Sequence, residues 1–176
     1  MLKFLFKFAL FSIIIIIMDD NSLKKIISKE GEEFFLDVKS LELSKFLKDF
    51  NNDFPDKDIP LNEVDSKTLK KIIEYLKHYT GDEKPKEIPK PLSSGDLKPL
   101  LPEFDYNFIS SVSLQDCVDL VNAANYLDIP GLCDLICARL ASEMLNCEVE
   151  EARAKFSIEC DMTPEEVEEY EKYPLD

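Results

Sequence analysis

Hydrophobic and polar residues follow two different periods along the first part of the chain. Residues 23–38 read LKKIISKEGEEFFLDV, with two short apolar runs on either side of a polar segment that contains Gly31. Glycine adopts the positive φ that a tight turn needs, so this segment predicts a β-hairpin. Residues 40–50, SLELSKFLKDF, instead repeat apolar positions at intervals of three and four. This spacing predicts a helix with one buried face, for which Ser40 is the expected N-cap.

A short strand, a helix and a loop are predicted next. Ile59-Pro60-Leu61 predicts an edge strand, because proline is tolerated at the margin of a sheet. Residues 66–79 predict a helix that lies on the sheet, with one apolar stripe formed by Leu69, Ile72, Ile73 and Leu76. Residues 80–102 hold five of the ten prolines and two of the four glycines. We expect a solvated linker of variable shape there.

The second half of the chain predicts three helices in succession. Residues 103–110 predict a short helix. A stronger one follows Ser113, its expected N-cap, and carries an apolar stripe of Leu114, Val118, Val121 and Ala124. Pro130 occupies the first turn of the third helix, where its missing N–H costs nothing. The apolar stripe of that helix consists of Leu132, Leu135, Ile136, Leu140 and Met144.

The C-terminal segment is acidic but keeps an apolar pattern. From residue 143 to 176 there are twelve acidic and three basic side chains. Apolar residues at near-helical intervals predict two short amphipathic helices: Val149, Ala152, Phe156 and Ile158, then Val167, Tyr170 and Tyr173. Thr163 and Glu166 form a capping box at the start of the second. Isolated helices shorter than roughly 12–15 residues are marginal in water, so these helices need a partner, either another protein or the chain's own core.

Composition excludes several classes of function. The net charge of −15 would repel a phosphate backbone, so nucleic acid is not an expected partner. The five cysteines include no CxxC pair, and there is one histidine. We therefore expect no metal site and no disulfide framework, but reduced, mostly buried thiols, with Cys133 and Cys137 in core packing. No glycine-rich phosphate loop or catalytic triad can be assembled, so no enzyme and no cofactor are expected.

Residues 1–18, MLKFLFKFALFSIIIIIM, differ from the rest of the chain. Two lysines precede an apolar run from Phe8 to Met18 that only Ser12 interrupts. No small-residue cleavage site follows, and about eleven apolar residues fall short of the roughly twenty that span a bilayer as a helix. We expect translated upstream or intron sequence, with Met18 as the true start. A targeting or anchoring segment is the alternative, and only in that case is a membrane an expected partner.

The segment AANYLDIPGLCDLICARLASEM, followed by EEARAKFSIECDMTPEE, resembles the Skp-one (S-phase kinase-associated protein one) family, the small adaptors of SCF ubiquitin ligases. The family pattern runs AANYLDIKGLLD and then TPEEIRKTFNI. The resemblance extends more loosely to the predicted hairpin and to LKKIIEYLKHY. It implies an α/β BTB/POZ fold, a small sheet with helices, followed by two C-terminal helices that complete an F-box-binding surface.

The resemblance also implies partners. In that family the BTB portion docks onto a cullin, the C-terminal helices hold the F-box of a substrate receptor, and there is no catalysis. Asn125 and Tyr126 match the family's Asn-Tyr at the cullin contact, with closure of the helix end by Tyr126 as the alternative. The expected F-box-binding residues, for which packing in the chain's own core is the alternative, are Leu135, Ile136, Leu140, Phe156, Ile158 and Tyr170.

Several departures mark a divergent member of the family. The segment after the hairpin is a few residues shorter than in the family. Glu148-Val149 stands where the family has Thr-Pro, and Ala152 stands where it has isoleucine. The family usually carries a tryptophan near its C-terminus that holds the F-box, but this chain has no tryptophan. Tyr173 and Leu175 could take over that role only in part. Weaker or altered F-box selection is expected.

These inferences define the expected organisation of the chain. Its parts are the extension 1–18, an N-terminal BTB/POZ part at 22–79, the linker 80–102, C-terminal BTB/POZ helices at 103–147 and Skp-type dimerisation helices at 148–176. The resemblance implies an adaptor between a cullin and F-box proteins, in the cytoplasm and nucleus. The alternative is another BTB module, such as an elongin C-like protein, which lacks the last two helices and does not bind an F-box.

Overall fold

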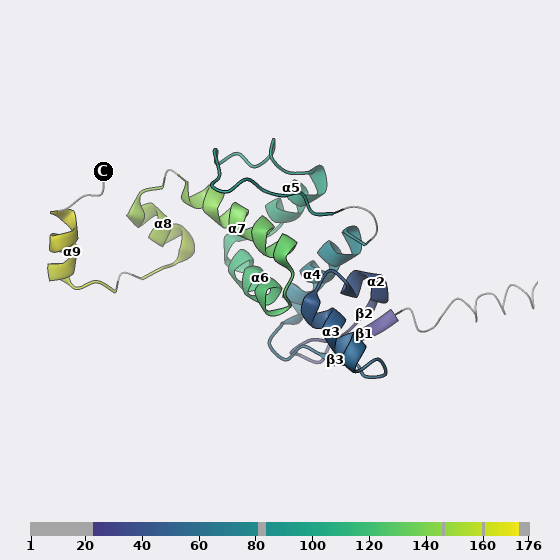
Figure 1. Ribbon diagram of the computed structural model, residues 1–176. Coiled ribbons are helices and arrows are strands. Elements are labelled where there is room, and N and C mark those ends of the chain that lie inside the picture. Colours follow the sequence, from purple (N-terminus) through teal and green to yellow (C-terminus); the bar gives the residue numbers. More distant parts are fainter. Residues whose placement is uncertain (1–22, 81–83, 146, 160, 173–176) are drawn as a thin grey trace, which may run out of the picture.

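The computed structural model in Figure 1 describes residues 23–80, 84–145, 147–159 and 161–172. The expectations for residues 1–18, Tyr173 and Leu175 fall outside these described residues. Within them, a three-stranded sheet is covered by helices, and the buried apolar side chains form one core. This is the α/β architecture that the sequence predicts.

The sheet begins with the predicted hairpin. β1 (Leu23–Ile27) pairs antiparallel with β2 (Glu33–Asp37), and Gly31 closes the turn with φ of +83°. β3 (Ile59–Pro60) runs parallel to β1, and the strand order is β2-β1-β3. The hairpin and the short edge strand are therefore both confirmed.

The expected N-cap at Ser40 is wrong, because two helices replace the single predicted one. Asp37 caps a short helix, α2 (Val38–Leu41), by accepting a hydrogen bond from the Ser40 N–H at 2.9 Å. The longer helix, α3 (Lys45–Asp53), starts after Ser44, whose hydroxyl accepts a hydrogen bond from the first turn at 3.1 Å. Either serine could have served as a cap by spacing alone. The carboxylate before Ser40 decides between them.

The predicted helix on the sheet is α4 (Ser66–His78). Asp65 caps it by accepting a hydrogen bond from the Thr68 N–H at 2.9 Å. The apolar stripe is confirmed, since all four of its members are buried: Leu69, Ile72, Ile73 and Leu76. α4 packs against α2 and against a later helix, α6 (Leu114–Tyr126), and so occupies the centre of the fold.

The proline-rich segment has no helix or strand between residues 84 and 102, as expected. It is nevertheless held against the body of the protein, because Ile88, Leu97 and Leu101 are buried in the core. The expectation of a wholly solvated linker is therefore wrong. Irregular backbone has no period that would reveal its buried positions in the sequence.

The next two helices, α5 (Glu103–Ser110) and α6, begin and end close to the predicted residues, and Ser113 caps α6 as expected. The buried face of α6 differs from the predicted stripe, however. Val118 is exposed, whereas the core side of the helix presents Cys117, Leu120, Ala123 and Ala124. Apolar residues lie on two sides of this helix, and their spacing does not say which side faces the core.

The helix α7 (Pro130–Met144) starts with proline in its first turn, as predicted. The prediction of core packing is confirmed for Cys133, which packs against the core, and is wrong for Cys137. Cys133 is half-buried and Cys137 is exposed, and among the four described cysteines only Cys117 is buried. The expectation of mostly buried thiols is therefore wrong.

Both predicted C-terminal helices are present, as α8 (Val149–Phe156) and α9 (Pro164–Glu171). The capping box is confirmed: Glu166 accepts a hydrogen bond from the Thr163 N–H at 2.8 Å, and the Thr163 hydroxyl accepts one from the Glu166 N–H at 3.3 Å. In Figure 1 both helices follow the end of α7 on the side away from the sheet, and α9 lies beyond α8; α8 still contacts α6. The described residues from 147 to 172 are called the C-terminal arm below.

Candidate functional site

The helices α3 and α6 meet at a hydrogen-bonded junction. The hydroxyl of Ser44 is buried and donates to the Leu127 carbonyl at 2.5 Å. The N–H groups of Lys45 and Phe46 donate to carbonyls that follow α6 at 3.2 and 3.4 Å. The first backbone N–H groups of α3 have no acceptor within their own helix, and the carbonyl groups at the end of α6 have no donor within theirs. Each set supplies the partners that the other lacks. The junction therefore fixes how the two helices present their side chains.

Asn125 and Tyr126, the residues matched to the cullin contact, lie at this junction in the last turn of α6. Both are exposed, Tyr126 to 40%. The Tyr126 ring packs against the Phe46 ring, with 5.1 Å between the ring centroids. Tyr126 is therefore held in place by α3 while its phenol edge stays open to a partner.

Aromatic rings continue from Tyr126 along α3. The ring centroids of Phe46 and Phe50 are 6.5 Å apart, and those of Phe50 and Phe54 are 5.2 Å apart. Phe54 is exposed, and the Lys57 ammonium lies 4.7 Å from the centroid of its ring. We call Phe46, Phe50, Phe54 and Tyr126 the aromatic row. Large aromatic side chains of this kind are enriched at protein interfaces.

Sequence reasoning missed the aromatic row as an interaction surface. Phe46 and Phe50 were assigned to a buried helix face, but both are only half-buried. The signal that could have found the row is the recurrence of phenylalanine at 46, 50 and 54. A spacing of four places side chains one above the other on a helix.

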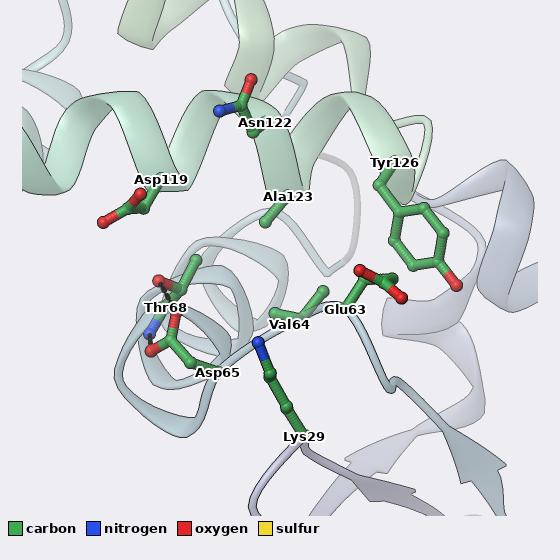
Figure 2. Close-up of a pocket in the computed structure, with 9 residues that line it drawn as sticks. All are labelled: Lys29, Glu63, Val64, Asp65, Thr68, Asp119, Asn122, Ala123 and Tyr126. Carbon is green, nitrogen blue, oxygen red and sulfur yellow. Dashed lines mark hydrogen bonds between the residues drawn. The ribbon is translucent and has the colours of Figure 1, made fainter.

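A hollow of about 460 Å³ opens on the other side of Tyr126, between α6 and the loop that precedes α4 (Figure 2). Its charged lining residues are Lys29, Glu63, Asp65 and Asp119. Burial alone would raise the pKa of the Asp65 carboxyl, but hydrogen bonds from Thr68 hold that pKa below its usual value. Three carboxylates and one ammonium group therefore line the hollow, and this side of Tyr126 is acidic.

The second candidate surface is the apolar side of the C-terminal arm. No residue of α8 is buried. Val149 is exposed, Ile158 is 56% exposed and Phe156 is half-buried. At the end of α7, Met144 is exposed as well. These apolar side chains have not folded back into the chain's own core, which was the alternative to a partner.

Polar contacts hold α8 to the end of α7. The Lys155 ammonium donates to the Glu143 carbonyl at 3.2 Å and lies 3.3 Å from the Cys147 sulfur. Arg139 pairs with the Glu143 carboxylate and lowers its pKa. Solvent-exposed contacts of this type contribute typically only about 0–1 kcal/mol each. These polar contacts therefore add little to the attachment of α8, which also lies beside α6.

The structure does not gather the residues expected to bind an F-box. Leu135 and Ile136 are 2% and 0% exposed, because they lie on the core side of α7. In the free chain these two residues belong to the core, which was the alternative, and their contact with an F-box stays a prediction. Leu140 is half-buried and packs against the core from outside. Phe156 and Ile158 belong to the arm, whereas the side chain of Tyr170 lies outside the described part of α9.

Two further findings concern the described residues as a set. No group of three or more histidine, cysteine, aspartate or glutamate side chains among them could hold a metal ion. No helix in the same part of the chain is long and apolar enough to cross a membrane.

Two family models match the chain. Residues 22–81 match the model described as "Skp1 family, tetramerisation domain". Residues 130–173 match the model described as "Skp1 family, dimerisation domain". The first match covers the sheet and the helices up to α4, and the second covers α7 and the arm.

Full-length relatives agree with these matches. The S-phase kinase-associated protein 1 homolog of Tetrahymena thermophila is 38% identical over 151 residues, which are 85% of this chain and 90% of that protein. The suppressor of kinetochore protein 1 of Schizosaccharomyces pombe is 34% identical, over 84% of this chain and 92% of that protein. The E3 ubiquitin ligase complex SCF subunit sconC of Arthroderma otae is 33% identical, over 79% of this chain and 84% of that protein.

Proposed function

The chain belongs to the Skp1 family, and from this membership we propose that it is the adaptor subunit of a cullin-based SCF ubiquitin ligase. The adaptor bridges the cullin scaffold to F-box substrate receptors in ubiquitin-dependent protein degradation. Its POZ-type part carries the cullin-facing surface, and its C-terminal arm carries the F-box-facing surface.

One observation supports the F-box role above the others. Among the described side chains of the arm helices, no apolar one is fully buried in the chain itself, although each helix is too short to be stable alone. Fully burying one Val, Ile or Phe side chain contributes about 1.5–3 kcal/mol, so a few such residues against a receptor would offset much of the cost of ordering the arm. A partner that supplies the missing apolar surface accounts for the sequence of the arm.

The cullin role is supported by the α3–α6 junction. Asn125 and Tyr126 offer an exposed amide and an exposed aromatic edge on a rigid corner. The aromatic row extends this surface, and the acidic hollow borders it. An elongin C-like module would keep this half of the protein but would lack the arm, which the second family match includes.

The adaptor supplies no catalytic group, cofactor or metal of its own, and it works in the cytoplasm and nucleus. Its action is to hold two proteins in one complex. Ala152, which stands where the family has isoleucine, removes apolar surface from the arm, and Glu148-Val149 replaces the family's Thr-Pro. Altered selection among F-box receptors follows.

Purification from its own cells tests the proposal. A tagged copy of the chain is expressed at its normal level, and the bound proteins are identified by mass spectrometry. The adaptor role predicts a cullin and at least one F-box protein among them. Recovery of neither would overturn it.

A further inference from the structure

A groove runs between the proline-rich segment and α7, on a part of the surface that neither candidate site includes. Its volume is about 340 Å³, within the range of roughly 300–1,000 Å³ that is common for binding pockets. The lining is largely apolar, with Pro89, Pro91, Leu92, Cys137, Ala141 and Leu145 as main members. The two charged residues that line it, Lys90 and Asp134, pair with each other at 2.7 Å.

Both walls of the groove are anchored to the core. Ile88 and Leu97 are buried on either side of the segment that forms one wall, and Ala138 is buried beneath the other. A Cβ atom placed on Gly95 would lie 3.3 Å from the Ser142 carbonyl, so the segment approaches the α7 backbone closely. A groove whose walls are already ordered binds at a lower entropic cost.

The groove ends at the C-terminus of α7, next to the start of the arm in the sequence. Leu145 lines the groove and is also the C-cap of α7, and it is 37% exposed. Met144, beside it in the chain, is exposed too, and α8 begins at Val149. Exposed apolar residues therefore follow one another along the chain from the groove, past the end of α7, to the first residue of α8.

We propose that this groove is a docking site for apolar side chains of the F-box receptor that the arm engages. The inference rests on the proposed function and adds a determinant of receptor choice to it. The paired charges of Lys90 and Asp134 leave nothing to attract a strongly acidic or basic segment, whereas a proline- or leucine-rich segment next to the F-box would bury apolar surface there. Receptors with such a segment bind more tightly than receptors without one.

Substitutions on the two walls test the groove. Pro89→Asp introduces a charge on the proline-rich wall, and Ala141→Lys introduces one on α7; both residues are exposed, so neither change disturbs the core. Pro99→Asp is the matched control, because Pro99 is an exposed proline of the same segment outside the groove. The probe is an F-box protein that copurifies with the wild-type chain, purified separately and titrated against each variant.

We expect each groove variant to weaken receptor binding by about tenfold or more, with cullin binding and the urea midpoint unchanged. Pro99→Asp should match the wild type. Wild-type affinity in both groove variants would overturn the inference and leave the adaptor role intact. A dimer of the free chain that Pro89→Asp dissociates would also overturn it, because a second copy would then occupy the groove. A wild-type chain that binds no F-box protein at all would refute the adaptor role itself.

Discussion

The buried hydroxyl of Ser44 donates a hydrogen bond to the carbonyl of Leu127 at 2.5 Å and so joins the start of α3 to the end of α6. Tyr126 precedes that carbonyl, and its ring rests on Phe46, the second residue of α3. The aromatic row, to which both rings belong, therefore depends on this one junction. The shape of the proposed cullin-facing surface is set by a contact that lies beneath it.

Substitution of Ser44 by alanine should destabilise the fold. It removes the N-cap of α3 and leaves the Leu127 carbonyl without this donor, at a combined cost of about 1–3 kcal/mol in the free energy of unfolding. Urea denaturation measures the change. Ser110→Ala is the control, because the Ser110 hydroxyl is exposed and donates to a carbonyl of its own helix. This substitution should change the free energy of unfolding by no more than about 0.5 kcal/mol. Equal stability of the two variants would contradict the role given to the junction.

Replacing Asn125 and Tyr126 together by lysine should abolish cullin binding and preserve F-box binding. Both side chains are exposed, so two added charges act on the interface rather than on the core. Titration with each purified partner separates the two functions. Ser110→Lys combined with Gln115→Lys adds the same charge at exposed positions elsewhere and should bind both partners. Loss of both partners in the Asn125/Tyr126 variant would identify a folding site instead of a docking site.

Two isoleucines should behave in opposite ways. Ile136→Ala removes a fully buried side chain from α7 and should lower the free energy of unfolding by about 2–5 kcal/mol. Ile158→Ala removes an exposed side chain of the arm and should leave stability within about 0.5 kcal/mol while it weakens the binding of an F-box receptor. Calorimetry and titration measure these effects. A stable Ile136→Ala chain, or an Ile158→Ala chain with full receptor affinity, would contradict the assignment of core and interface.

The stability of the fold should depend on the protonation of Asp105. Burial raises the pKa of this carboxyl, although the Tyr79 hydroxyl, which donates to it at 2.7 Å, and the nearby His78 both lower it. The folded chain therefore binds the proton more tightly than the unfolded chain does. The resulting stabilisation is complete below the unfolded pKa of about 3.9 and is lost as the pH rises through the folded pKa.

Asp105→Asn tests this dependence, because the amide oxygen can still accept the hydrogen bond from Tyr79. At pH values above the folded pKa of Asp105, the variant should be more stable than the wild type. Its free energy of unfolding should also change less with pH. Urea midpoints between about pH 4 and 8 measure the difference. Glu103→Gln is the control, because Glu103 is exposed on the same helix. The stability of this variant should depend on pH in the same way as that of the wild type. An Asp105→Asn profile that coincides with the wild type would contradict the prediction.

The sequence predicted most elements because local signals are strong where they occur. Gly31 defines the hairpin, Ser113 and Thr163 cap their helices, and Pro130 starts α7. Each of these residues acts on the backbone within a few positions of itself. The predictions that they support do not depend on distant parts of the chain.

The predictions from the sequence were wrong or left alternatives open at positions where contacts between distant parts of the chain determine the structure. Ser44 caps α3 and its hydroxyl also reaches Leu127, 83 residues further along the chain, whereas Ser40 is bound by the Asp37 carboxylate. Leu135 and Ile136 belong to an apolar stripe that is wide enough to pack in the core or against a partner. Only the folded structure shows that both side chains are buried in the core. Ile88 belongs to a segment without any period, so its burial could not be read from spacing. A pattern of residues identifies an apolar face but not what covers it.

Amide hydrogen exchange tests the central claim most directly, which is that the apolar side of the C-terminal arm is covered by another protein. The exchange rates are measured for the free chain and for its complex with a purified F-box receptor. The claim predicts rapid exchange in α8 and α9 of the free chain, slow exchange in α4, α6 and α7, and strong protection of α8 once the receptor binds. Arm helices that are already as protected as α4 in the free chain, and that do not change when the receptor is added, would contradict it.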